Sequence, residues 1–210
     1  MAATRIGNVD VSVGGGICCW TSGLAVDCDG CPEAYHPEGS PPGLDHLANA
    51  GRLGNWWGVA TDTGEPDGNP IIQGSGSPAP GFLVSCTALA DHGFANGDPR
   101  RYVDANKIPY VSVPPELRRL GVKLGDVCLV GYKDKECCAV VAEVGPLGSI
   151  GEGSMQLARV LGINPDPRRG GVGAGVRYSI FMGSTRGWPR TVADIDDQVN
   201  ELRPSLLQCV

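Results

Sequence analysis

Residues 127–163, VCLVGYKDKECCAVVAEVGPLGSIGEGSMQLARVLGI, contain the pattern that decides the fold. Two apolar, β-rich runs, Val127–Tyr132 and Cys138–Val144, are joined by the polar segment Lys133–Glu136, which predicts a β-hairpin. A loop rich in glycine and proline then leads into Ser154–Leu161, whose apolar residues recur at helical spacing. A serine before this run and Gly162 after it are typical of a helix cap and a helix end. The segment therefore predicts strand, hairpin, strand, loop and helix in that order.

The rest of the chain is poor in long regular elements. Glycine (32 residues) and proline (17 residues) are abundant, and few stretches avoid both for the roughly twelve residues that a stable isolated helix needs. We expect one domain, residues 1–210, that is mainly β with long loops. The pattern predicts strands at 56–61, 82–89, 110–113 and 176–182, short helices at 44–50 and 191–202, and loops at 18–43 and 62–80.

Composition restricts the class of partner. A net charge of -6 and a pI near 5.0 oppose a nucleic-acid partner, because phosphate binding needs a basic face. The first 50 residues hold six acidic residues and one base, and such an acidic surface suits a cationic or neutral substrate. The chain has no apolar run long enough for a membrane span and begins without the apolar core of a secretory signal. We expect no nucleic acid, membrane or cofactor as partner, and a monomer.

The nine cysteines do not form a complete metal motif. Cys28 and Cys31 have the spacing of half a zinc site, but Cys18 and Cys19 are adjacent, which is poor geometry for tetrahedral coordination. A structural disulfide or simple buried thiols are therefore favoured over zinc, and we expect no metal site. The odd number leaves at least one cysteine without an intrachain partner.

Two carboxylates stand at the ends of the predicted loop. Glu143 ends the second strand and Glu152 precedes the helix, nine residues later. A strand end and a helix start on one loop can face a common cleft, and glycines between them let a polymer approach the backbone. Two carboxyls flanking a scissile bond hydrolyse glycosides, because one protonates the leaving oxygen while the other activates water or attacks the sugar. Alternatively, both are surface groups, and Glu152 simply complements the helix dipole.

Three short motifs resemble glycoside hydrolase family 75, the fungal-type chitosanases. They are Val26-Asp-Cys-Asp-Gly30, Arg101-Tyr-Val-Asp104 followed by Ile108-Pro-Tyr110, and Ile150-Gly-Glu-Gly-Ser154. The resemblance spans residues 17–185 and implies an endo-acting, inverting hydrolase that cleaves the β-1,4 bonds of chitosan. It also implies secretion and a catalytic pair formed by Glu143 and Glu152.

This chain departs from the family pattern at Glu143, where the family has aspartate. The extra methylene moves the carboxylate by about 1.5 Å, and a shift of about 1 Å can change a rate on the order of 100-fold. Alternative second carboxylates are Asp27, Asp29 and Asp104. Within the pair, Glu152 near a helix start suits a base and a desolvated Glu143 suits an acid; the opposite assignment stays open.

The segment also resembles the signature of a double-psi β-barrel. This second resemblance implies a six-stranded double-psi-like barrel decorated by long loops and a few short helices. Expansins, some endoglucanases and septal lytic transglycosylases share such a barrel, and a fold does not decide the reaction. Peptidoglycan or chitin therefore remain alternative substrates, and a non-catalytic, expansin-like glycan-binding protein is an alternative function.

Other residues are candidates for contacting the sugar chain. Of Trp56 and Trp57, only one can face a cleft from an alternating strand, and packing in the core competes with stacking on a sugar. Asp27 and Asp29 point the same way in an extended chain, which suits an amino-sugar ammonium group. The candidate substrate contacts are Asp27, Asp29, Tyr35, Trp57, Asp104 and Ser154.

Overall fold

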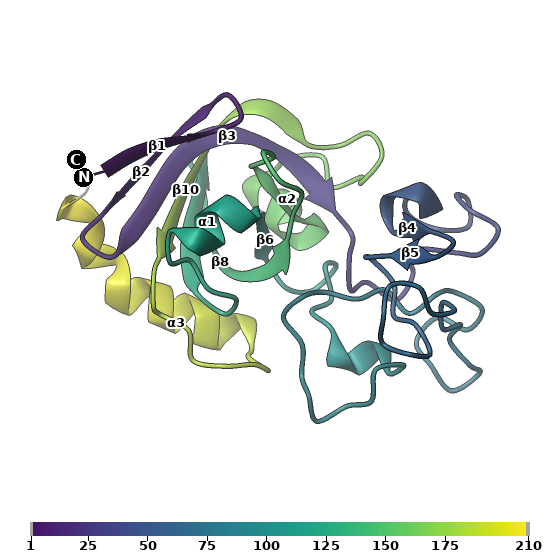
Figure 1. Cartoon of the computed structure of the whole chain (residues 1–210). Helices are drawn as coiled ribbons and strands as arrows, with labels where there is room; N and C mark the ends of the chain where they lie inside the picture. The colour runs from purple at the N-terminus through teal and green to yellow at the C-terminus, as the bar shows by residue number, and fades with distance from the viewer. Residues whose placement is uncertain (1, 209–210) are drawn as a thin grey trace.

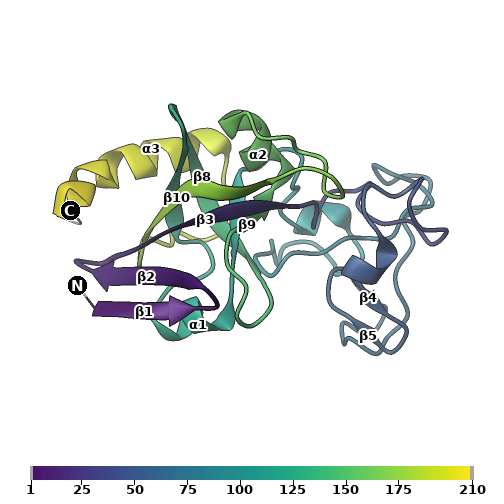
Figure 2. The same cartoon turned by 90° about the horizontal axis from the view of Figure 1, so that it is seen from above.

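The computed structural model describes residues 2–208, and its centre is a closed β-barrel of six strands (Figures 1 and 2). The strands follow one another around the barrel in the order β3-β10-β7-β8-β6-β9, and β9 pairs with β3 to close it. The predicted mainly β, six-stranded barrel with long loops and few short helices is confirmed. The barrel strands are β3 (Ile17–Asp27), β6 (Tyr110–Val113), β7 (Val127–Tyr132), β8 (Lys135–Val144), β9 (Glu152–Ser154) and β10 (Val172–Phe181).

Short elements surround the barrel. The hairpin of β1 and β2 extends the sheet beyond β3, and Figure 1 shows it on the same side of the molecule as α3. The remaining strands are β1 (Ala2–Ile6), β2 (Val9–Gly14), β4 (Gly51–Arg52) and β5 (Asn55–Trp56). The helices are α1 (Pro115–Arg119), α2 (Met155–Leu161) and α3 (Val192–Leu202), with 3-10 turns at Leu47–Asn49, Pro99–Arg101 and Arg203–Gln208.

Side chains alternate between two apolar clusters on the two faces of the barrel wall. Val111 and Val141 point inward and pack with Leu157 of α2. Tyr110 and Val140 point to the outer cluster, which also contains residues of α3 and of the loops. The period of two along each strand therefore separates the barrel interior from an outer layer.

The hairpin and the helix of the stretch quoted above fold as predicted, but the predicted loop between them also contains the short strand β9, which carries Glu152. Strands β7 and β8 form an antiparallel hairpin, and Lys133 takes a positive φ of 54° in the tight turn. Helix α2 begins after Ser154, and Gly162 ends it with a left-handed backbone. The final helix is also confirmed, because Thr191 and Asp194 form a reciprocal capping box at the start of α3.

Three predictions of strand or loop are wrong, one of them being the strand at 56–61, where only Trp56 belongs to a strand. Residues 18–27 were expected to be loop but belong to β3, an eleven-residue strand paired on both edges. Conversely, 82–89 forms only isolated bridges, such as Leu83 with Ile72 and Ser85 with Val59. This region folds around polar anchors instead: the buried Gln73 amide donates to the carbonyls of Pro32 and Leu83 at 2.7 and 3.0 Å.

The expected disulfide is not present in the described part of the chain. The eight cysteines between residues 18 and 138 form no disulfide with one another, and Cys209 lies outside the described residues. Cys18 and Cys19 are neighbours on β3, as Cys137 and Cys138 are on β8, so each pair points to opposite faces of its strand. Residues 2–208 also contain no cluster of three or more side chains suited to a metal ion.

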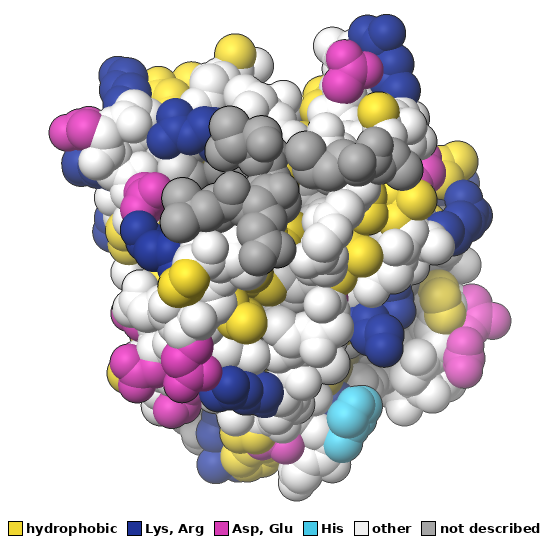
Figure 3. Space-filling view, turned by 90° about the vertical axis from the view of Figure 1, so that its left-hand side faces the viewer, with side chains coloured by type: hydrophobic (Ala, Val, Ile, Leu, Met, Phe, Trp, Pro, Cys, Tyr) yellow, Lys and Arg dark blue, Asp and Glu magenta, His cyan; other side chains and the backbone are white. Residues whose placement is uncertain are grey.

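The surface away from the loops carries mixed charge. Figure 3 shows the side of the molecule that bears the chain ends, and acidic and basic side chains alternate across it. The acidic surplus of the sequence is therefore not gathered on this face. None of the helices within residues 2–208 combines the length and apolarity required to cross a bilayer.

Ser154 is fully buried and ties three segments together. Its hydroxyl donates to the Ile108 carbonyl at 2.8 Å and accepts from the N–H groups of Tyr110 and Leu157 at 3.0 and 3.1 Å. We predict that Ser154→Ala lowers the free energy of unfolding by about 2 kcal/mol, because the cap and its buried partners are lost together. Urea denaturation measures the effect. Ser75→Ala, on an exposed loop, is the matched control and should change stability by less than about 0.5 kcal/mol.

Candidate active site

The two predicted carboxylates lie on either side of one residue of β6. Ser112 is the pairing partner of Glu143 on β8 and also of Glu152 on β9. Adjacent strands lie about 4.8 Å apart, so the Cα atoms of the two glutamates are separated by about 9.5 Å across Ser112. Glu143 and Glu152, nine residues apart in the sequence, are thus separated by a single strand in the barrel wall.

A β-bulge turns Glu143 toward the same face as Glu152. Val111 pairs with Val141, but the next residue, Ser112, pairs with Glu143, so Ala142 is the additional residue in β8. In a regular strand Glu143, two residues after Val141, would share its face and point into the apolar barrel interior. The bulge instead directs its carboxyl outward, which is a common use of bulges beside functional sites.

A groove of about 650 Å³ runs over these residues on the outer face. One wall is the barrel and the other consists of loop residues 29–57, which Figure 1 shows beside the open end of β3. Five carboxyl groups and no Lys, Arg or His occur among its lining residues, all of which lie in the described part of the chain. The principal polar and aromatic lining residues are Asp27, Asp29, Tyr35, Asp45, Trp57, Ser112, Glu143 and Glu152.

Four predicted substrate contacts lie in this groove. Asp27 ends β3, and its carboxylate accepts from the Asp29 N–H at 2.8 Å. The Tyr35 hydroxyl donates to the Asp29 carboxylate at 2.7 Å, which fixes that side chain at the base of the groove. Trp57 is 58% exposed and lies at the rim, whereas Trp56 packs against the outer cluster. Trp57, and not Trp56, therefore lines the groove.

The two remaining predicted contacts lie elsewhere. Ser154 is buried as the cap of α2 and does not line the groove. Asp104 forms an ion pair with Lys107 at 2.8 Å and also lies outside the groove lining. Both therefore have structural partners of their own.

Burial and mutual repulsion raise the pKa values of four groove carboxyls, those of Asp27, Asp29, Glu143 and Glu152. The pKa of Glu143 rises to about 8, chiefly through desolvation and then through the charge of Asp27, although the N–H groups of Val144 and Ala88 oppose the shift. Desolvation and Asp27 also raise the pKa of Glu152 to about 7, and Ser112 opposes that shift. The pKa values of Asp27 and Asp29 are raised as well, desolvation again being the main cause. Near neutral pH the site can therefore hold both a carboxylic acid and a carboxylate.

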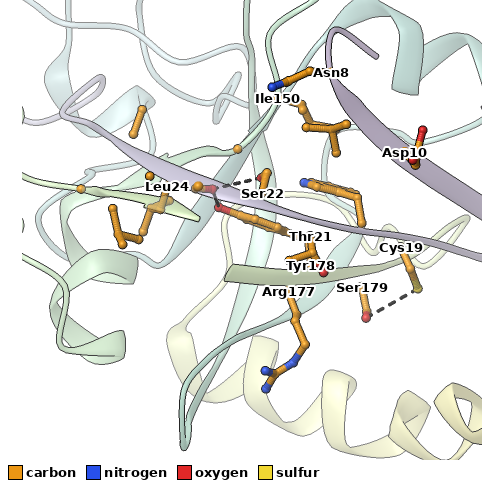
Figure 4. Close-up of a pocket in the computed structure, with 18 of the residues that line it drawn as sticks. Asn8, Asp10, Cys19, Thr21, Ser22, Leu24, Ile150, Arg177, Tyr178 and Ser179 are labelled. Carbon is orange, nitrogen blue, oxygen red and sulfur yellow. Dashed lines mark hydrogen bonds between the residues drawn. The ribbon is translucent and has the colours of Figure 1, made fainter. Parts of the chain in front are cut away.

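Two further hollows adjoin the groove. A hollow of about 1120 Å³ lies between β2, β3 and β10 and shares Ala25 with the groove, next to Glu152 (Figure 4). Figure 4 shows Thr21, Arg177, Tyr178 and Ser179 of β3 and β10 around it. A smaller hollow of about 380 Å³ shares Trp57 and includes Ala88, whose N–H donates to Glu143 at 2.9 Å. Each hollow thus shares one lining residue with the groove and includes a backbone partner of one glutamate.

Three residues of the site were not predicted from the sequence: Ser112, Asp45 and Ala88. Ser112 lies within a predicted strand, and its alternation with Val111 and Val113 was the one available signal. Asp45 is buried, and its carboxylate accepts hydrogen bonds from the backbone N–H of His46 and the side-chain amide of Asn49. Ala88 contributes only a backbone N–H, which residue type does not encode.

No protein-family model matches the chain, and no curated protein sequence matches it significantly.

The raised pKa values predict that the protein loses stability as pH rises. Below about pH 4.5 these carboxyls are protonated in both states, but between that value and about 8 the unfolded chain releases protons that Glu143 and Glu152 retain when folded. The free energy of unfolding should fall over this range by up to about 1.4 kcal/mol per pH unit for each group. Urea denaturation between pH 5 and 8 measures the slope.

Glu143→Gln should reduce the slope of the free energy of unfolding against pH, because the amide does not titrate. Glu38→Gln removes an exposed carboxyl and should leave the slope as in the wild type. Equal slopes in all three proteins would contradict the assigned burial of Glu143.

Proposed function

We propose that the protein is an endo-acting glycoside hydrolase that cleaves β-1,4 bonds of chitosan or a related amino-sugar glycan by inversion. The observation that supports the proposal most directly is the pair of desolvated glutamates facing one groove on either side of Ser112. Inverting hydrolysis requires two carboxyl groups about 6.5–9.5 Å apart, with room for a water molecule between them. The strand spacing of about 9.5 Å between the Cα atoms is compatible with that requirement.

The proposed roles follow from the local environments. Glu143 holds its proton more tightly and gives it to the glycosidic oxygen as the bond to the anomeric carbon breaks. Glu152 ionises more readily and removes a proton from water, whose oxygen attacks the anomeric carbon from the opposite face. The water oxygen and one of its hydrogens form the hydroxyl group on the anomeric carbon of one product, and the leaving oxygen with the proton from Glu143 forms the hydroxyl group of the other. Proton transfer through solvent from Glu152 to Glu143 then restores both carboxyls.

The groove also suits the proposed substrate class. Five carboxyls without a basic side chain favour a cationic polymer, and Trp57 offers an exposed aromatic face at the rim. Each hollow that adjoins the groove includes a backbone partner of one glutamate, which leaves space for further sugars and supports internal cleavage. The motifs that resemble family 75 chitosanases support the same substrate.

Removing either carboxyl should abolish cleavage. Glu152→Gln and Glu143→Gln are each expected to lower kcat on chitosan oligomers by about 10²–10⁴-fold, because general acid or base catalysis is lost while the shape is kept. Product masses measure cleavage, and NMR of freshly released ends should show inverted anomers. Glu38→Gln is the matched control and should keep wild-type activity.

A panel of chitosan, chitin and peptidoglycan identifies the glycan. Cleavage of chitin or peptidoglycan alone would replace the proposed substrate but keep the catalytic pair. Binding of a glycan without any cleavage, equal in wild type and Glu143→Gln, would refute the hydrolase and favour a glycan-binding function.

The pKa values predict a narrow, bell-shaped pH dependence. Below about pH 7 Glu152 becomes protonated and no longer accepts a proton, and above about pH 8 Glu143 loses the proton that it donates. Initial rates of oligomer cleavage, measured as kcat/KM from pH 5 to 9.5, should be highest between these limits. A rate that stays constant across pH 6–9 would contradict both assignments.

A further inference from the structure

The Ser112 hydroxyl is a buried polar group whose purpose the fold does not explain. The side chain is 2% exposed, and its hydroxyl oxygen has no hydrogen bond of ordinary geometry with any residue in 2–208. A buried hydroxyl without a partner costs stability. Valine or threonine would suit a strand of this kind better, as at Val111 and Val113. Because Ser112 lines the groove, we look for a role of its hydroxyl among the groove residues.

Gly145 brings the backbone close to Ser112 and Glu152 at once. A β-carbon at Gly145 would lie 2.9 Å from the Ser112 hydroxyl oxygen and 3.2 Å from the Glu152 Oε2 atom. The hydroxyl and this carboxyl oxygen thus face a shared space beneath the residue 145 backbone. Since Ser112 also pairs with Glu152 across the β6–β9 ladder, backbone hydrogen bonding fixes their relative position.

The two glutamates differ in what supports their negative charge. The Glu143 carboxyl accepts from the N–H groups of Val144 and Ala88 at 2.7 and 2.9 Å. Glu152 has no such backbone donor among its neighbours in the described chain, and Ser112 is the side chain that favours its ionised form. The other titratable groups that face Glu152 are the carboxyls of Asp27, Asp29 and Glu143 and the phenol of Tyr178, and all of the carboxyls oppose its ionisation.

We propose that Ser112 is a positioning residue that orients the Glu152 carboxylate and keeps it ionised, and thereby makes Glu152 the base of the pair. The inference rests on the proposed function and deepens it. Ser112 donates its hydroxyl hydrogen toward Glu152 and leaves the other carboxylate oxygen for the attacking water. It is neither consumed nor ionised in the reaction: the proton from water goes to Glu152, and the proton for the leaving oxygen comes from Glu143.

The decisive experiment measures the titration of Glu152 without relying on activity. Protein labelled with ¹³C at glutamate side-chain carboxyls is titrated from pH 4 to 9.5, and Glu152→Gln identifies the resonance. In Ser112→Ala the pKa of Glu152 should rise by about one unit, because a hydrogen bond to a charged acceptor is lost. The pKa of Glu143 should move much less, since its donors are elsewhere.

The same variant should alter the rate profile in one direction. The acid limb of kcat/KM should move to higher pH by about one unit, so that activity well below the limb falls about tenfold, while the alkaline limb stays in place. Gly145→Ala is a second, independent variant whose methyl group would push the hydroxyl and the carboxyl apart, and it should shift the acid limb in the same direction.

Ser149→Ala is the matched control, because this exposed serine lies on the loop between the same two glutamates. An unchanged Glu152 titration in Ser112→Ala, or an equal shift in Ser149→Ala, would overturn the proposal. A second outcome is that Ser112→Ala shifts the Glu152 titration while the wild-type protein cleaves none of the glycans tested. That outcome would refute the hydrolase and still support the coupling of Ser112 to Glu152. The failures of the two proposals are therefore distinguishable.

Discussion

Strand β6 is the constraint on which the rest of the molecule depends. It has only four residues, yet it pairs in parallel with β8 on one edge and antiparallel with β9 on the other. These pairings bring together segments that the loop 145–151 would otherwise leave free, and β9 then closes the barrel against β3. Backbone hydrogen bonds in the wall, rather than contacts among the acidic side chains, hold the carboxyls together. This matters because the carboxyls repel one another and lose water when buried.

The two walls of the groove are built by different means. The barrel wall is a hydrogen-bonded sheet with apolar clusters on both faces. The opposite wall is formed by loops that rely on turns, isolated bridges and a few polar anchors. Gly30 illustrates how close the packing is: its φ is 76°, and a β-carbon there would lie 2.1 Å from the Val103 carbonyl oxygen. Only glycine satisfies both the backbone conformation and this approach.

The sequence was most informative where local signals agreed with the tertiary structure. The hairpin at 127–144, the capped helix α2 and the capping box of α3 combine periodicity with turn and cap residues, so their identity was predictable. Their bounds were close to those expected, except that β8 begins at Lys135 rather than Cys138. The glutamate pair was predictable as a pair because a strand end and a helix start bounded one loop. Strand β3 was missed because Cys18, Cys19, Cys28 and Cys31 suggested a cross-linked loop, whereas its alternation of buried and exposed residues depends on partners distant in sequence. The same limit applies to Ser112 and Ala88. Ser112 contributes through its pairing with both glutamates, and Ala88 contributes through its backbone N–H.

The bulge in β8 makes the site sensitive to strand register in a way that residue identity does not reveal. If the same residues of β8 paired with β6 without the bulge, Ser112 would lie opposite Ala142 and Val113 opposite Glu143, and the carboxyl of Glu143 would face the apolar interior. Such a chain could retain the barrel, the loops and the aromatic rim while losing the proposed proton donor from the groove. Two proteins with the same residues in this strand can therefore differ in their site by one position of register. The pairing of this strand is then more diagnostic than the types of its residues.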